Sequence, residues 1–197
     1  MPDKPDLAAL LGSRICHDLI SPIGAISNGV ELLMMDGAVP GPEMALVSES
    51  VAAANARIKY FRVGFGTASA EQRIGKSEVT GILADAMRGR LSVDWHSKVD
   101  LSRREVKLAF LLIQCVETAM PYGGRIHVDQ TDGRWIITAQ SPKLRVDPDL
   151  WELLSNPAAH VDIGPAHVHF PLAAQEIAAQ GMRLTADIRE HELRLSF

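Results

Sequence analysis

Apolar side chains recur at helical spacing along the first third of the chain. Between Leu7 and Met34 they return every three or four residues, which is the spacing of one helix face. This run is much longer than the average globular helix of about 11–12 residues. A second run extends from Met44 to Phe65, and residues 36–42, rich in glycine and proline, separate the two. We therefore expect a long antiparallel helical hairpin.

The predicted hairpin cannot bury both of its apolar stripes by itself. A two-fold dimer solves this problem, because two hairpins together close a four-helix bundle with a shared core. The sequence therefore predicts a homodimer built on the first two helices.

The pattern changes after a polar connector at Glu71–Ser77 and predicts a second unit of mixed helices and strands. Ser102 and Glu105 have the spacing of a capping box that starts a helix, and Asp132-Gly133 is typical of a two-residue hairpin turn. We expect an α+β fold with helices on one face of a mostly antiparallel sheet, and domains at residues 1–70 and 71–197. The expected helices are Ser77–Met87, Arg103–Met120, a short one opened by Asp147-Pro148, and Leu172–Ala179; the expected strands are Leu91–Trp95, Arg125–Gln130, Trp135–Gln140, Arg183–Ile188 and Glu192–Phe197.

Composition narrows the classes of function. The chain has 20 basic and 24 acidic residues, without the basic cluster of a nucleic-acid-binding protein. Its longest apolar stretch, near residues 108–116, is far shorter than the roughly 20 residues of a membrane span. Cys16 and Cys115 are too far apart in the chain to suggest a metal knuckle and fit reduced thiols. We expect a cytoplasmic protein without nucleic-acid or membrane partners.

His17 is the candidate for chemistry within the first predicted helix. Ile15, Leu19 and Ile23 are expected to hold the buried stripe, so that His17 faces solvent. Pro22 lies inside the same helix at a cost of about 3 kcal/mol, and two glycines that follow cost about 1 kcal/mol each relative to alanine. Unfavourable residues gathered beside an exposed histidine indicate function. The alternative is a solvated histidine–aspartate pair.

The run HDLISPIGAISNG at residues 17–29 resembles the H-box of histidine kinases, in which a histidine is followed by an acidic residue, Leu, a variable position, Thr or Ser, and Pro. Residues 13–33 together with FRVGFG at residues 61–66 are similar to the ChpT family of bacterial histidine phosphotransferases. This resemblance implies a dimeric phosphorelay protein. Its hairpin would form a four-helix bundle, followed by an α/β sandwich like the ATPase domain of histidine kinases.

The nucleotide-binding motifs of such kinases are absent from the second unit. Gln114 and Thr118 stand where kinases have two asparagines, and threonine is a poor ligand for Mg²⁺. Ser141–Arg145 replaces the adenine-reading Asp-x-Gly-x-Gly loop. Residues 166–171 replace the glycine-rich lid with bulky side chains that keep the backbone from phosphates. We expect no ATP binding, so His17 must receive its phosphoryl group from another protein.

The resemblance implies that the donor is a phospho-aspartate on the receiver domain of a hybrid kinase and that the acceptor is a receiver aspartate on a response regulator. A neutral imidazole suits this role at cytoplasmic pH. We expect no cofactor or metal site in the chain itself, since the receiver would supply Mg²⁺. Asp18 is expected to orient His17 or tune its basicity. Arg14 is a candidate for contacting the phosphoryl group, and Ser21 stands where related bundles position a hydrolytic water.

Geometry predicts where a receiver would dock. With a rise of about 1.5 Å per residue in both helices and a turn near residue 39, position 17 is level with about position 61. Small and apolar residues around this level would let a receiver helix approach. The alternative is that Phe61 and Phe65 lie in the core of the bundle. For at least one of them, this is the better prediction. The predicted surface comprises Ile20, Ile23, Gly24, Ser27, Phe61, Arg62 and Phe65.

Other interpretations remain open at this stage. His160, Asp162, His167 and His169 would suggest a metal site, but the prolines at 165 and 171 indicate a loop and disfavour it. A divergent ATP-dependent histidine kinase is an alternative enzyme. A dimeric adaptor that binds signalling proteins without carrying phosphate is the alternative outside enzymes.

Overall fold

The structure of the protein is a computed structural model. It describes residues 11, 14–15, 18–19, 21–26, 28–29, 32, 41–66, 68–69, 71–97, 100–156 and 159–197. His17 lies outside the described residues, as do Ile20, Ser27 and Cys16. The described residues between 11 and 32 are helical.

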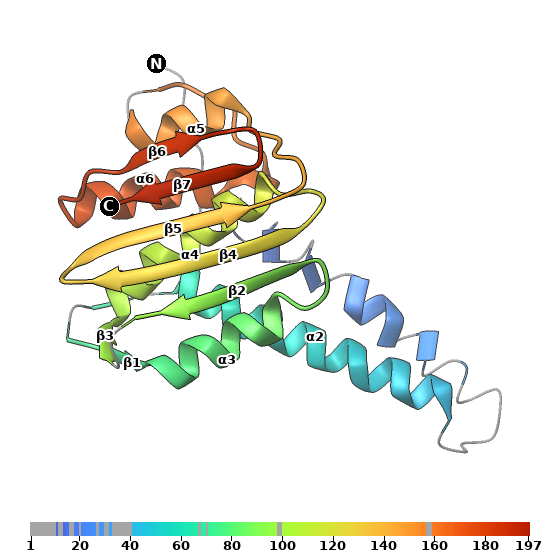
Figure 1. The fold of residues 1–197 in the computed structure, drawn as a ribbon. Helices are drawn as coiled ribbons and strands as arrows, with labels where there is room; N and C mark the ends of the chain where they lie inside the picture. Colours follow the sequence, from blue (N-terminus) through green and yellow to red (C-terminus); the bar gives the residue numbers. More distant parts are fainter. Residues whose placement is uncertain are drawn as a thin grey trace.

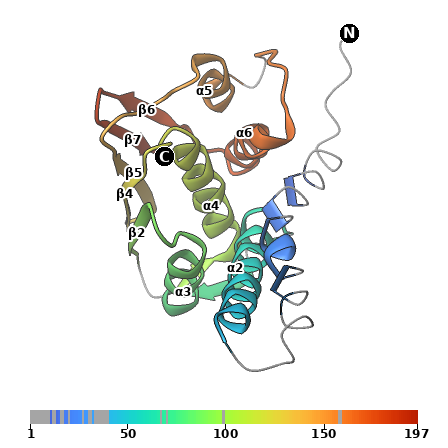
Figure 2. The ribbon, with the colours of Figure 1, turned by 90° about the vertical axis from the view of Figure 1, so that its right-hand side faces the viewer.

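Helix α2 (Pro42–Gly64) corresponds to the second predicted apolar run and begins with its proline in the first turn. The described residues between 11 and 32 lie alongside it in two perpendicular views (Figures 1 and 2). Gly29 allows this approach, because a Cβ there would collide with the side chain of Val47. Ile15 packs against the core, but Ile23 is 53% exposed. The prediction of a buried Ile23 is therefore wrong for the single chain, since no described residue covers that side of the helix.

A five-stranded sheet forms the second unit, in the order β2-β4-β5-β7-β6. The pair β2–β4 is parallel and the other three pairs are antiparallel, so the predicted mixed fold with a mostly antiparallel sheet is confirmed. Asp132 and Gly133 turn the chain with φ of 52° and 78°, as the hairpin signal predicts. The strands are β2 (Leu91–His96), β4 (Gly124–Thr131), β5 (Arg134–Gln140), β6 (Thr185–Ile188) and β7 (Glu192–Ser196).

The helices of this unit cover one face of the sheet (Figures 1 and 2). Ser102 begins α4 through the predicted capping box, and the side chain of Asp147 caps α5. Within the part of the chain that the structure describes, no helix is long and apolar enough to span a membrane. The elements are α3 (Lys76–Ala86), α4 (Arg103–Thr118), α5 (Pro148–Ser155), the short 3₁₀ helix η1 (Pro165–His167) and α6 (His169–Ala179).

Helix α4 is the centre of the core. Every residue from Leu108 to Val116 is buried, and the sheet, α6 and α2 surround the helix (Figure 2). Tyr60 of α2 stacks on Phe110 with ring centroids 5.0 Å apart and donates its hydroxyl to the Phe110 carbonyl at 3.2 Å. Burial raises the pKa of Tyr60 well above its usual value, so the hydroxyl remains a donor. One continuous core therefore includes both α2 and the second unit.

The structure differs from the sequence-based expectation in two segments. Part of the predicted polar connector is a strand, β1 (Arg73–Gly75), which pairs with β3 (Asp100–Ser102). A strand of three residues is too short to show the alternation of apolar and polar side chains by which strands are predicted from a sequence. Helix α6 begins at His169 instead of Leu172, because Pro171 lies in its first turn, where the backbone N–H has no intrahelical acceptor. The end of the segment predicted as a loop is thus helical.

The cap of α4 provides a test of the fold. Ser102 Oγ accepts from the Glu105 backbone N–H, and Glu105 accepts from the Ser102 N–H. Ser102→Ala should lower the free energy of unfolding by about 1 kcal/mol, measured by urea denaturation. The control is Ser155→Ala, because this exposed hydroxyl donates only to a carbonyl of its own helix; a change within about 0.5 kcal/mol is expected. Equal effects of the two variants would contradict the role of the cap.

Candidate functional site

Two of the predicted site residues form an ion pair on the first helix. Arg14 Nε donates to Asp18 Oδ2 at 2.9 Å, and the two side chains are only 18% and 13% exposed. Their spacing of four residues places them on the same helix face, one turn apart. Asp18 directly follows His17 in the sequence. The structure therefore brings Arg14 and Asp18 together at the start of the H-box.

Arg14 also reaches the second unit. Its Nη1 donates to the carbonyl of Ala166 at 3.0 Å, across 152 residues of sequence. Ala166 belongs to η1, the short segment that leads into α6. The guanidinium thus links the first helix to that segment, a contact that no local sequence pattern predicts.

A hydrogen bond at the end of α4 holds the next part of this segment against that helix. The hydroxyl of Thr118 donates to the Gln114 carbonyl at 2.9 Å and lies 3.0 Å from His169 Nε2. Because the hydroxyl has only one proton, His169 Nε2 must be the donor in the second bond. The ring is 1% exposed, and its burial, with smaller contributions from Arg14 and His167, lowers its pKa to about 3. His169 is therefore neutral at pH 7, with its proton on Nε2.

The sequence positions matched to the nucleotide motifs are occupied by internal contacts. Gln114 is buried beneath Gly64 and donates to the carbonyl one turn earlier at 3.4 Å. Ser141 is buried and donates to the Gly123 carbonyl at 2.8 Å. Phe170 is fully buried beside His169, with ring centroids 4.9 Å apart. The side chains of Gln114, Ser141 and Phe170 are therefore all engaged in contacts within the protein.

The predicted docking residues fall into two groups. Ile23 and Gly24 are exposed on the first helix, and the side chain of Arg62 is exposed on α2. Ser21, the candidate for positioning a water, is also exposed on the first helix. Phe65 is half-buried against the core, whereas Phe61 is 3% exposed and lies within it. Assigning Phe61 to a docking surface is wrong, because its side chain is buried in the core that α2 shares with the second unit, and the centroid of its ring is 5.2 Å from that of Phe65.

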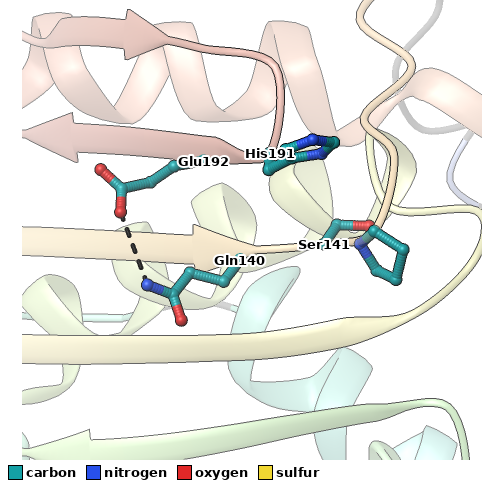
Figure 3. A pocket seen from close by; sticks show the side chains of 5 residues that line it. Gln140, Ser141, His191 and Glu192 are labelled. Atoms are coloured by element: carbon teal, nitrogen blue, oxygen red, sulfur yellow. Dashed lines mark hydrogen bonds between the residues drawn. The ribbon is translucent and has the colours of Figure 1, made fainter.

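No group of three His, Cys, Asp or Glu side chains among the described residues is arranged to hold a metal ion. His169, one member of the cluster considered from the sequence, instead bonds to Thr118. A shallow hollow lies at the end of β5, where Gln140 Nε2 is 3.5 Å from Glu192 Oε2 (Figure 3). It is lined by Gln140, Ser141, Pro142, His191 and Glu192, none of which the sequence analysis assigns to the phosphotransfer site.

Comparison with known proteins identifies the family. The family model of the histidine phosphotransferase C-terminal domain matches residues 76–192. The protein phosphotransferase ChpT of Brucella abortus (strain 2308) is 36% identical over 189 residues, which cover 91% of this chain and 89% of that protein. The chain belongs to the histidine phosphotransferase family. A bacterial phosphotransferase of known structure is 32% identical, with a TM-score of 0.80 over 100% of this chain and 97% of that one.

Membership in this family confirms the activity that the sequence resemblance predicts, protein histidine phosphotransfer in a phosphorelay. The sequence did not predict two contacts of the structure. One is the hydrogen bond between Thr118 and His169, and the other is the hydrogen bond from Arg14 to the Ala166 carbonyl. A signal for the first was present, because His169 stands between the apolar residues Val168 and Phe170. The second joins distant segments and has no local signal.

The neutral His169 predicts a specific acid sensitivity. The folded chain keeps the ring unprotonated down to about pH 3, whereas the unfolded chain binds a proton near pH 6.5. The unfolded state therefore gains protons as the pH falls through this window, and stability decreases. Between pH 7 and pH 5.5 the wild type should lose roughly 1 kcal/mol relative to His169→Gln, measured by urea denaturation at each pH.

The matched control for this measurement is His160→Gln, which removes an exposed histidine from the same unit. It reports how much of the pH dependence follows from losing any histidine. Parallel stability curves for the wild type and His169→Gln over this pH range would contradict a buried neutral ring.

Proposed function

We propose that this cytoplasmic protein carries a phosphoryl group on His17, from a phospho-aspartate in the receiver domain of a hybrid kinase to an aspartate in a response regulator. Family membership carries the proposal, together with the H-box that begins at His17. The Arg14–Asp18 ion pair beside that motif supports it. Residues 1–70 would supply dimerisation and phosphotransfer, and residues 71–197 a degenerate ATPase-like unit.

The proposed transfer needs no nucleotide. One nitrogen of the neutral His17 ring attacks the phosphorus of the acyl phosphate in line. A P–N bond forms, the P–O bond to the aspartate breaks, and the carboxylate leaves with the electron pair. The other ring nitrogen keeps its proton, so the ring becomes cationic. Asp18 would orient the ring and stabilise this charge, and the reverse step on the second receiver restores the neutral histidine.

The remaining site residues have supporting roles in this proposal. Ser21, exposed one turn after His17, would position a hydrolytic water. A receiver helix would dock over Ile23, Gly24, Arg62 and Phe65, together with Ile20 and Ser27, which lie outside the described residues. Mg²⁺ would come from the acidic pocket of the receiver, since no described cluster in this chain suits a metal ion.

A homodimer is part of the proposal, with the hairpins forming a four-helix bundle. Met44, Val51 and Ile58 are 43%, 40% and 49% exposed on α2. Their spacing of seven residues places them on one face of the helix. Leu32 adds an exposed apolar side chain on the first helix. Burying this surface against a second copy would remove it from water.

Phosphotransfer is tested by incubating the full chain with a receiver domain that carries labelled phospho-aspartate. The wild type should acquire an acid-labile, base-stable label, and His17→Gln should acquire none, because glutamine lacks the nucleophilic ring nitrogen. A parallel incubation with labelled ATP alone separates the alternatives. Label from ATP would indicate a divergent kinase, and absence of label from either donor would indicate a non-enzymatic adaptor.

The dimer is tested by placing a charge on the exposed stripe of α2. Ile58→Glu should raise the dimer dissociation constant at least about tenfold, which corresponds to about 1.4 kcal/mol, in analytical ultracentrifugation. Ile188→Glu is the matched control, because Ile188 is similarly exposed at 41% but lies on β6. Equal dissociation constants for the two variants would contradict a dimer through α2.

A further inference from the structure

We propose that Arg14 is a positioning residue for phosphotransfer and that it acts as a clamp between the H-box helix and the segment at residues 165–169. This inference rests on the proposed function of His17. It assigns a new role to residues 165–169. This segment, which stands in place of a nucleotide lid, would hold the first helix in the arrangement that reacts.

The clamp depends on the shape of the guanidinium group. Arg14 uses Nε for Asp18 and Nη1 for the Ala166 carbonyl, at 2.9 Å and 3.0 Å. The two bonds leave one rigid planar group in different directions, so they fix the Asp18 carboxylate relative to η1. A lysine ammonium has the same charge but only one nitrogen, at the end of a flexible chain. It cannot reproduce both bonds in this geometry.

The acceptor of the clamp is itself held firmly. Val168 and Phe170, which follow η1, are fully buried, and the His167 N–H closes the turn on the Gly164 carbonyl at 3.0 Å. The Thr118–His169 hydrogen bond then attaches this segment to α4. Because α4 is the centre of the core, the Ala166 carbonyl has a fixed position. The chain of contacts runs from the core through η1 and Arg14 to Asp18, the neighbour of His17.

A separate link supports the same arrangement from α2. Arg57 on α2 lies 3.6 Å from Glu117, next to Thr118 near the end of α4. The hairpin and the second unit are thus connected by polar contacts from both helices, in addition to their shared core. A reacting histidine must meet a phosphorus atom in line, and an error of about 1 Å in such geometry can cost a large factor in rate.

The test compares Arg14→Gln and Arg14→Lys with the wild type, using labelled phospho-receiver at saturating concentration. Both variants should transfer about tenfold more slowly, with KM for the receiver within about twofold of the wild type. Labelling by phosphoramidate, a small donor that needs no docking, should slow by a similar factor. Rescue by lysine, or a defect confined to KM, would overturn the proposal, because charge or docking would then explain the effect.

Two further variants separate the clamp from general destabilisation. Thr118→Val removes the bond that anchors the segment while keeping the side-chain shape, and it should also slow transfer. Combined with Arg14→Gln it should add little, because both changes break the same chain of contacts. Arg104→Gln is the matched control: Arg104 donates to the Ala179 carbonyl at the other end of α6, and its loss should leave the rate unchanged.

The outcomes also distinguish the clamp from the proposed function. If the wild type takes no label that depends on His17, the proposed function fails. If the wild type is labelled on His17 and Arg14→Gln transfers at the same rate, only the clamp is refuted. Fully multiplicative effects of Arg14→Gln and Thr118→Val would also refute it, since the two residues would then act independently.

Discussion

The complete burial of α4 is the constraint on which the rest of the structure depends. A helix with apolar side chains on every side must be covered on every side. The sheet and α6 cover two sides, and α2 covers a third, where Tyr60 stacks on Phe110. Each large side chain buried in this way contributes about 1.5–3 kcal/mol. Helix α2 is therefore joined to the second unit through a common core.

This burial also determines what the polar groups of α4 can do. Gln114 lies in the buried part of α4, and its carbonyl accepts a hydrogen bond from the hydroxyl of Thr118, which is exposed at the end of the helix and also bonds to His169. His169 in turn stays neutral because charging it inside the core would be costly. Gln114, Thr118 and His169 are thus parts of one hydrogen-bond network, which joins α4 to the start of α6.

Local chemistry accounts for what the sequence could predict. The capping box of Ser102 and Glu105 and the turn at Asp132-Gly133 both act within four residues, and the structure contains both. The burial of Phe61 has no such local signal, because its side chain lies in a core that includes residues far along the chain, among them those of α4.

The difference between local signals and contacts with distant residues also explains where α6 begins. Pro171 is a strong local signal for the end of a helix, and it predicted a loop. The signal was misleading because a proline in the first turn is compatible with a helix, and the burial of Phe170 against Trp151 extends that helix to His169. Tertiary packing outweighed a local preference here, as it did for β1 and β3, whose buried Ile74 and Leu101 pair across the two strands.

The shared core gives a physical reason for the second unit to accompany α2 in this histidine phosphotransferase. Removing that unit would expose the face of Tyr60 that now stacks on Phe110, and the Tyr60 hydroxyl would lose the Phe110 carbonyl. It would also remove Ala166, and Arg14 would then be tied only to Asp18 on its own helix. An ion pair of that kind, exposed on a helix, is worth only about 0.3–0.5 kcal/mol. The position of the carboxylate of Asp18, the residue that follows His17 in the sequence, is therefore set by the second unit as much as by the helix that carries it.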